Sequence, residues 1–250
     1  MEGNKELLFL DIETAPNLAH IWGMYEQNAL DFVSECYIMC YSAKWGKKHI
    51  VKGLPDYKGY SPGTENDYPL VKEVWDLLNN AEVVCWQNGD EFDKKKINTR
   101  FVYWGLGPPS PYKTIDTKKV AKRYFAFNSN ALDNMGQFLG LGRKIKHEGF
   151  ELWQKCLKGD LKAWNRMKKY CKNDITLLEK LYLRFVPWIQ THPNLWKDRI
   201  ACPKCGSNNI QSRGYVETNT TKYRRIQCNS CKGWSRCTEN LQAVKPLVSI

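Results

Sequence analysis

The sequence contains no long hydrophobic run, and no stretch approaches the roughly 18 consecutive apolar residues of a membrane-spanning helix. The first ten residues include Glu2, Lys5 and Glu6 and lack the apolar segment of a secretory signal peptide. Internal repeats and low-complexity segments are also missing. These absences argue against membrane, secreted and repeat proteins, so we expect no membrane partner and a soluble protein of the cytoplasm (the host cytoplasm, if a phage encodes it).

Histidine is scarce, and the four histidines form no spaced set: His20, His49, His147 and His192. Cysteine is not scarce, because the chain has ten. Five of them lie in apolar or helical contexts: Cys36, Cys40, Cys85, Cys156 and Cys171. Most of the others cluster near the C-terminus, which favours reduced thiols plus a metal site over a disulfide framework.

Acidic residues are outnumbered, with 26 Asp and Glu against 38 Lys and Arg, for a net charge of +12. Such a balance suggests a polyanionic partner, most often nucleic acid, although a soluble protein of high pI has the same charge. Residues 199–250 carry a balance of +7, against +5 for residues 1–198. The C-terminal part is therefore much more basic per residue.

Hydrophobic patterns predict an α/β arrangement. Strands are expected over residues 6–13, 36–46, 48–53, 81–88 and 112–117, and helices over 68–80, 90–105, 118–125 and most of 149–190. The sequence His192-Pro193-Asn194 ends the last helix, and a cysteine cluster follows it. We therefore expect a boundary near residue 198, between a domain of residues 1–198 and a small β domain of residues 199–250.

The stretch LLFLDIETAP, residues 7–16, places two carboxylates directly after an apolar run. Residues i and i+2 of a strand point to the same face, so Asp11 and Glu13 are expected side by side at the end of the first strand. Open α/β sheets tend to place their sites at such ends. Neighbouring carboxylates repel, and a shared Mg²⁺ or Mn²⁺ ion relieves the repulsion. The pair alone fits two solvated acids at a surface strand end equally well.

Two further motifs carry acids. The sequence NGDEFD, residues 88–93, follows the fourth expected strand and places Asp93 in the first turn of the next helix. In YCKND, Tyr170 and Asp174 are i and i+4 and share one helix face. Taken singly, Asp174 fits a solvated helix acid and Tyr170 an amphipathic core residue. Asp116 ends a short strand and is expected to cap the following helix.

Together these motifs resemble those of the DEDD exonucleases, in their tyrosine-containing DEDDy branch (DnaQ-like, ribonuclease-H-like superfamily). The family pattern is Asp-x-Glu, Asn-x-x-x-Phe-Asp and Tyr-x-x-x-Asp, matched in order by Asp11, Glu13, Asn88, Phe92, Asp93, Tyr170 and Asp174. The resemblance covers about residues 5–190, including a helical connector at residues 131–144. It implies a ribonuclease-H-like mixed sheet flanked by helices.

The resemblance also implies roles. Asp11, Glu13 and Asp174 would bind one Mg²⁺ or Mn²⁺ ion, and Asp11 with Asp93 a second, for phosphodiester hydrolysis by a two-metal-ion mechanism. Tyr170 would orient the attacking water, because its usual pKa of about 10 does not suit a base. It stands where the sister branch has a histidine, so no histidine is needed as base. Asn88 and Phe92 would contact the substrate.

Two Cys-x-x-Cys pairs lie near the C-terminus, in CPKCG (202–206) and CNSCKGW (228–234). This spacing fits a closed tetrahedral site, so we expect one structural Zn²⁺ in a zinc ribbon, held by Cys202, Cys205, Cys228 and Cys231. A redox pair is the alternative, but such a motif would not come doubled, and Cys237 is interpreted as a spare. So small a fold needs the metal for stability. The combination is similar to phage and bacterial predicted exonucleases.

Residues 210–227 are expected to form a β-hairpin that turns at TNTT, residues 218–221. Basic residues interleave with aromatic ones there, which suggests a nucleic-acid grip. The candidates are Arg213, Tyr215, Lys222, Tyr223, Arg224 and Arg225. A solvated face or a protein-docking surface is the alternative.

The expected function is a metal-dependent 3′-5′ exonuclease that acts on single-stranded nucleic acid, DNA more than RNA, and releases nucleoside 5′-monophosphates. The direction of attack rests on the resemblance. The alternatives are an RNA-directed nuclease on the same site, a catalytically inactive nucleic-acid-binding protein, and an adaptor that works through the ribbon.

Overall fold

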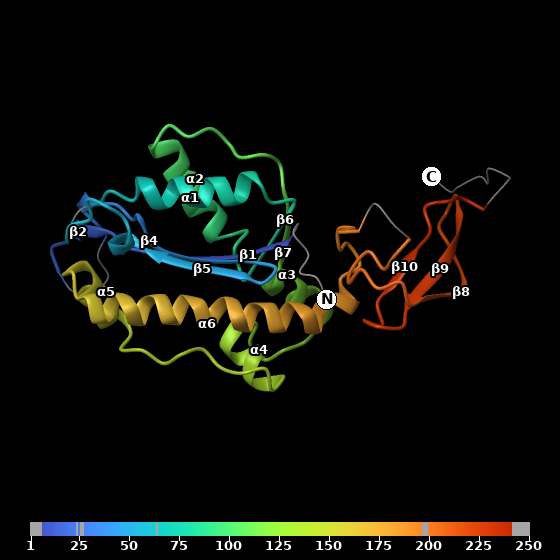
Figure 1. The fold of residues 1–250 in the computed structure, drawn as a ribbon. Helices are drawn as coiled ribbons and strands as arrows, with labels where there is room; N and C mark the ends of the chain where they lie inside the picture. The colour runs from blue at the N-terminus through green and yellow to red at the C-terminus, as the bar shows by residue number, and fades with distance from the viewer. Residues whose placement is uncertain (1–6, 24, 26–27, 64, 197–199, 242–250) are drawn as a thin grey trace. The chain divides into compact units, whose positions relative to one another are not determined.

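The computed structural model describes residues 7–23, 25, 28–63, 65–196 and 200–241 (Figure 1). The chain divides into two compact units, Met1–Leu181 and Tyr182–Ile250. This division falls within the long helix α6 (Leu161–Phe185). The expected boundary near residue 198 falls in residues 197–199, outside the described residues, so the assignment of domains at that point stays a prediction.

The first unit contains both strands and helices. Its strands are β1 (Leu7–Thr14), β2 (Leu18–His20), β3 (Asp31–Ser34), β4 (Ile38–Trp45), β5 (Lys48–Gly53), β6 (Val83–Trp86) and β7 (Lys113–Asp116). Its helices are the short η1 (Leu54–Asp56), α1 (Tyr68–Asn79), α2 (Asp93–Tyr103), α3 (Thr117–Tyr124), α4 (Leu132–Phe138), α5 (Phe150–Leu157) and most of α6.

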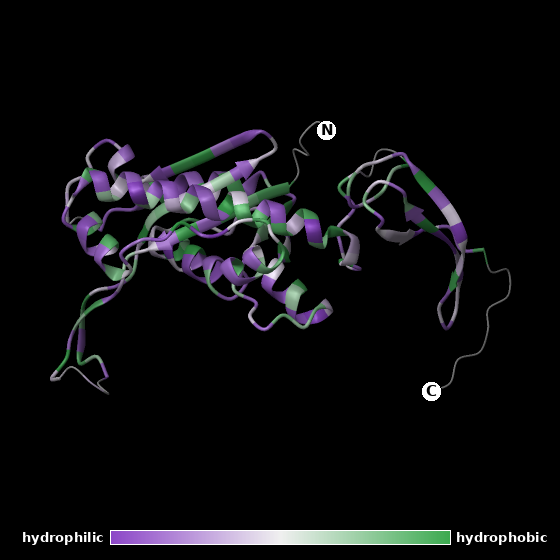
Figure 2. Ribbon diagram, turned by 90° about the horizontal axis from the view of Figure 1, so that it is seen from below, coloured by the Kyte–Doolittle hydropathy of each residue, from purple (hydrophilic) through white to green (hydrophobic). Residues whose placement is uncertain are grey.

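A five-stranded mixed sheet forms the centre of this unit, in the order β5-β4-β1-β6-β7. Strand β1 is antiparallel to β4 and parallel to β6. Its apolar run suits the central position, since Leu8 and Leu10 are fully buried. Helices α1 and α2 cover one face of the sheet and α6 covers the other (Figure 1). Figure 2 shows hydrophobic residues in the sheet and hydrophilic ones along much of the helices. The predicted mixed α/β fold is confirmed.

Three local predictions need correction. The hairpin β2–β3 was not expected, and it forms a separate two-stranded sheet. The helix expected over residues 149–190 is divided into α5 and α6. Gly159 adopts a positive φ of +85° after α5 and ends that helix. The Asp160 carboxylate then accepts hydrogen bonds from the N–H groups of Lys162 and Ala163 and caps the start of α6. The expected helical connector at residues 131–144 is helical only in α4.

The second unit begins with the last turn of α6 and the short helix η2 (Val186–Trp188). Strands β8 (Ile210–Glu217), β9 (Lys222–Cys228) and β10 (Trp234–Arg236) form an antiparallel sheet in the order β10-β9-β8. The predicted turn at residues 218–221 is confirmed, and β10 is an addition. In the part of the chain that the structure describes, no helix has the length and apolar character to cross a membrane.

A buried ion pair ties the strands to α2 in the first unit. The Asp67 carboxylate, which is fully buried, accepts hydrogen bonds from Nε and Nη2 of Arg100 at 2.8 and 2.6 Å. It also accepts from the backbone N–H of Ile38 at 2.8 Å and from Trp104 Nε1 at 2.6 Å. One carboxylate therefore joins β4 to α2, the helix that begins at Asp93.

Asp67→Ala should lower the free energy of unfolding by about 3–5 kcal/mol, because it leaves the Arg100 guanidinium buried without its partner. Denaturant unfolding followed by tryptophan fluorescence measures the loss. Asp76→Ala is the matched control, since Asp76 pairs with Lys72 on the exposed side of α1 and its loss should cost only about 0.5 kcal/mol. Equal losses in the two variants would contradict the role of the Asp67 network.

Candidate active site and zinc site

The candidate active site lies at one edge of the sheet, where parallel strands β1 and β6 both end. The two strands pair only as far as Phe9 and Cys85. Beyond that point the Ile12 N–H donates instead to Oδ1 of Asp93, at 3.1 Å. Asp93 is the first residue of α2, as predicted, and it takes the place that β6 would otherwise fill beside β1.

Helix α6 supplies the other side of the site. Asp11 and Glu13 lie on the same face of β1, and their carboxylate oxygens lie within 4.8 Å of each other and of the Cys171 sulfur on α6. Tyr170 and Asp174 occupy the same stretch of α6, and both are buried. The five predicted residues of the carboxylate site thus come together from β1, α2 and α6.

The four carboxylates perturb one another strongly. Burial, followed by the charges of Asp93, Glu13 and Asp174, raises the pKa of Asp11 well above its usual value. Burial and Asp174 raise the pKa of Glu13 to about 8. Burial raises the pKa of Asp93 to about 7, and it also raises the pKa of Asp174. With no cation present, these groups resist joint ionisation at neutral pH.

Among the described residues, Lys144 is the cation that forms an ion pair with this cluster. Its Nζ lies 2.7 Å from Asp174 Oδ2 and donates to the Tyr170 hydroxyl at 2.8 Å. Burial lowers the pKa of Lys144, but the Asp174 carboxylate and Tyr170 outweigh it, so the net shift is upwards and the ammonium stays charged. The edge of the His147 ring packs against Tyr170, with ring centroids 4.7 Å apart.

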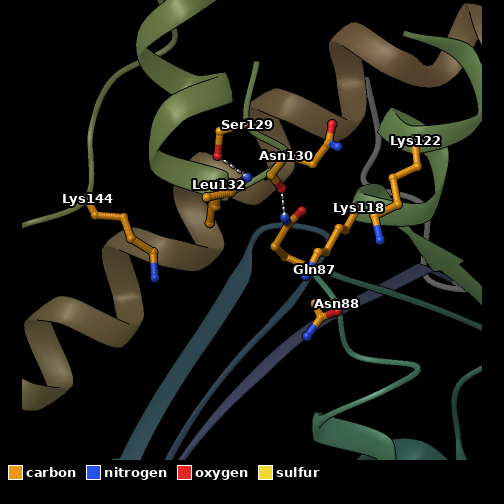
Figure 3. A pocket seen from close by; sticks show the side chains of 9 residues that line it. Gln87, Asn88, Lys118, Lys122, Ser129, Asn130, Leu132 and Lys144 are labelled. Carbon is orange, nitrogen blue, oxygen red and sulfur yellow. Dashed lines mark hydrogen bonds between the residues drawn. The ribbon is translucent and has the colours of Figure 1, made fainter. Parts of the chain in front are cut away.

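Lys144, the partner of Asp174, also lines a cavity of about 420 Å³ (Figure 3). Lys118 and Lys122 of α3 line one side, and Lys144 reaches in from the opposite side. The remaining lining residues are largely polar: Gln87, Asn88, Ser129, Asn130, Ala131 and Leu132. Such a volume lies within the roughly 300–1,000 Å³ of small-ligand sites.

The loop that carries the predicted substrate contacts is held by Asp116. Asn88 adopts a positive φ of 62° and lines the cavity, and its N–H donates to Asp116 Oδ1 at 3.0 Å. Asp116 also accepts the N–H groups of Lys118 and Lys119, which confirms that it caps α3. Phe92, next to Asp93, is 42% exposed, so its ring is open to solvent.

The four predicted zinc ligands also come together. The sulfurs of Cys202 and Cys231 are 3.6 Å apart, and those of Cys205 and Cys228 are 3.7 Å apart. A disulfide needs about 2.05 Å, whereas a tetrahedral site with Zn–S bonds of about 2.3 Å has sulfur–sulfur edges of about 3.8 Å. Burial raises the pKa of Cys205 to about 11, whereas the N–H groups of Cys231 and Ser230 outweigh burial at Cys228 and lower its pKa to about 7. The spacing and the donors fit zinc.

The fifth C-terminal cysteine stays outside this group: among the residues described, the cluster contains the two Cys-x-x-Cys pairs and not Cys237. The predicted grip residues are split between the two faces of the ribbon sheet. Tyr215 pairs with Arg224 across the strands and Val216 with Tyr223, so Tyr215 and Tyr223 point to opposite sides.

Residues 8–186 match the RNase_H superfamily. The chain belongs to that superfamily. A solved structure, that of the family B DNA polymerase from the hyperthermophilic archaeon Pyrobaculum calidifontis, shares the fold with a TM-score of 0.54 and 13% sequence identity. The match covers 73% of this chain but only 24% of the polymerase chain. No curated protein matches the chain.

Superfamily membership confirms the predicted ribonuclease-H-like fold and supports a nuclease. Within this RNase_H-superfamily domain, sequence reasoning missed Lys144 and His147. Neither residue lies in a spaced motif, because both belong to the irregular segment between α4 and α5. The only signal was the position of Lys144 at the end of the expected connector.

Lys144 is held by both neighbouring helices. Its backbone N–H donates to Asp133 of α4 at 2.7 Å. From α6, the Asn173 side chain donates to the Arg143 carbonyl at 3.0 Å and Lys180 donates to the Leu141 carbonyl at 3.2 Å. The irregular segment is therefore fixed against α6 just before Lys144.

Two buried carboxylate oxygens in this cluster have the character of metal ligands. Oδ2 of Asp11 and Oδ1 of Asp174 are buried and have no hydrogen-bond partner among the described residues. An unsatisfied buried acceptor costs about 1–3 kcal/mol, and more when it is charged. Carboxylate oxygens are the donors that Mg²⁺ and Mn²⁺ prefer. The residues present therefore fit divalent metal, which nucleases of this fold use.

Asp11→Asn should stabilise the protein when divalent metal is withheld, because it removes one of four repelling charges. We expect the thermal midpoint to rise by roughly 2–4 °C, the shift that about 1 kcal/mol gives in a domain of this size. Raised pKa values mean that the folded chain binds more protons than the unfolded one. The stability of the unsubstituted protein therefore falls as pH rises between about 4.5 and about 8. The rise in the thermal midpoint caused by Asp11→Asn should accordingly be large at about pH 8 and small at about pH 5.

Thermal melts at both pH values, with and without Mg²⁺, measure this effect. Asp31→Asn on the exposed strand β3 is the control and should show no pH-dependent gain. A variant that is no more stable than the unsubstituted protein at the higher pH, or that keeps the full stabilisation by Mg²⁺, would refute the carboxylate cluster as a metal site.

Proposed function

We propose that this protein is a metal-dependent 3′-5′ exonuclease that hydrolyses single-stranded nucleic acid, with DNA favoured, and releases nucleoside 5′-monophosphates. The observation that carries the proposal is the meeting of Asp11, Glu13, Asp93 and Asp174 around buried oxygens that lack partners. The superfamily and the likeness to a DNA polymerase support nucleic acid as the substrate. The polarity rests on the resemblance of the three motifs to DEDDy exonucleases.

In this proposal Asp11, Glu13 and Asp174 would hold one divalent ion, and Asp11 with Asp93 would hold a second. Such ions, when bound, activate a water and stabilise the leaving oxygen of a phosphodiester. The protein's own contribution is to keep the carboxylates in one place, since α6 and β1 fix them before any ligand arrives.

Tyr170 acts in the proposal as a donor that orients the attacking water. Burial and the Asp174 carboxylate raise the pKa of Tyr170 above its usual value, so the hydroxyl keeps its proton at neutral pH. Lys144 donates to the Tyr170 oxygen and fixes its position. A base role for the tyrosine does not fit this electrostatic setting.

The cavity that Lys144 lines suits the backbone of the strand. Lys118 and Lys122 are i and i+4 on α3 and present two positive charges to it. We assign these lysines to phosphate contacts, which set position and affinity without reading sequence. Phe92 offers an exposed ring on which the terminal base can stack.

A degradation assay tests the proposed reaction. Single-stranded DNA and RNA of one sequence, labelled at the 5′ end, are incubated with Mg²⁺, with Mn²⁺ or without divalent metal. We expect a ladder that shortens from the 3′ end, and a loss of roughly 10²-fold or more in Asp174→Asn, because a metal ligand is worth several kcal/mol. Glu179→Gln on the same helix is the control and should stay active.

Cleavage that survives Asp174→Asn would overturn the site assignment. Internal cuts, or a ladder from the 5′ end, would overturn the polarity but keep the nuclease. Faster degradation of the RNA strand would select the RNA-directed alternative.

Lys118→Ala and Lys122→Ala test the cavity separately. Each should raise KM with little change in kcat, and each should reduce the slope of log affinity against log salt by about 0.7, the value for one phosphate contact on a single strand. Lys95→Ala is the control, because Lys95 is an exposed lysine of α2 that pairs with Glu91. Unchanged KM and salt slope in both cavity variants would exclude the strand from this cavity.

A further inference from the structure

One face of the ribbon sheet combines aromatic rings and arginines. Residues that pair directly across strands share a face, and Arg225 pairs with Arg236 while Gln227 pairs with Trp234. With Tyr223, which is two residues from Arg225 on β9, they form what we call the arginine–aromatic face: Tyr223, Arg225, Trp234 and Arg236. Sequence reasoning missed Trp234 and Arg236, because β10 was not expected.

The rings and guanidinium groups of this face stack on one another. The guanidinium carbon of Arg236 lies 3.6 Å from the Tyr223 ring centroid, and that of Arg225 lies 5.0 Å from the Trp234 ring centroid. Arg225 Nε also donates to the Arg213 carbonyl at 3.0 Å. Long arginine side chains are thereby held on the sheet, so a ligand that used them would lose less side-chain entropy on binding.

Within the described strands of the ribbon sheet, no acid pairs with the arginines of this face. Arg225 and Arg236 are direct cross-strand partners, an arrangement that is destabilising between like charges. In strands β8 to β10 the one acidic residue is Glu217, which pairs with Lys222 at 2.8 Å on the opposite face. An anionic ligand would relieve the repulsion between the two arginines.

Exposure decides between a packing role and a binding role for the aromatic rings. Trp234 is 45% exposed, although the ribbon buries Cys202 and Cys228 in its own small core. An indole ring left open beside two arginines matches the combination that holds single strands, in which bases stack on aromatic rings and cations contact phosphates.

We infer that the arginine–aromatic face binds single-stranded nucleic acid, with bases stacked on Trp234 and Tyr223 and phosphates held by Arg225 and Arg236. This inference does not depend on the proposed exonuclease activity. It divides the predicted grip, because Tyr215, Lys222 and Arg224 lie on the opposite face. A duplex hides its base faces, so it is a poorer ligand than a strand of the same sequence.

Fluorescence anisotropy with the full chain tests the inference, using labelled single-stranded DNA, RNA of the same sequence and the DNA duplex, with no divalent metal added. Trp234→Ala and Tyr223→Ala should each raise Kd for the single strands by about 5- to 150-fold, the range for loss of one stacked base. Arg225→Gln and Arg236→Gln should each lower the salt slope by about 0.7. Trp234→Phe should restore most of the affinity, since a planar ring remains.

The matched controls are Tyr215→Ala and Lys222→Gln on the opposite face, which should bind as the unsubstituted chain does. Zinc content of one ion per chain verifies that each variant keeps its ribbon. If a variant loses zinc, Trp234→Phe and the two arginine variants decide the result in its place. Three results would overturn the inference: equal losses of affinity on both faces, equal affinity for duplex and single strand, or unchanged binding in Trp234→Ala with zinc retained. The last result would favour a protein-docking surface.

Discussion

Repulsion among four closely spaced carboxylates is the constraint on which the first unit depends. Asp11 and Glu13 project from a strand whose other residues are nearly all apolar, so burial and like charge both oppose their ionisation. A fold can keep such a cluster only if the surrounding elements are fixed by other interactions. The buried run of β1 and the Asp67–Arg100 pair supply that support, because they anchor the strand and the helix that carry three of the four acids.

Lys144 meets part of the same constraint. One ammonium cannot balance four carboxylates, and its direct partners among the described residues are Asp174 and Tyr170. Its backbone is nevertheless fixed by side chains from α4 and α6, in a segment that has no regular structure of its own. The metal-free cluster therefore resists full ionisation, and the oxygens without partners among the described residues, on Asp11 and Asp174, are where a cation would contact it.

The sequence was sufficient wherever the pattern was local. An apolar run followed by Asp-x-Glu predicted the central strand and its acids, and the two Cys-x-x-Cys pairs predicted the thiol cluster, because each depends on short spacing. Periodicity could not predict the break between α5 and α6, which depends on the backbone of Gly159 and a cap from Asp160. Periodicity also could not predict which side chains share a face of the ribbon sheet. An irregularity between Ser212 and Tyr215 shifts the alternation of side chains along β8, and this shift decides the face on which Tyr215 lies.

Affinity for a polyanion has to come from outside the carboxylate cluster. Four acids repel a phosphodiester until cations cover them, so the reacting centre contributes little to the first encounter. In the proposed function, basic groups elsewhere attract and hold the strand, and the described residues offer two sets: the lysines around the cavity and the arginines of the ribbon. The charge balance follows this division, since residues 199–250 carry +7 in a much shorter stretch than the +5 of residues 1–198. Because the basic residues that attract the strand lie outside the carboxylate cluster, the cluster can keep the closely spaced acids that metal binding requires.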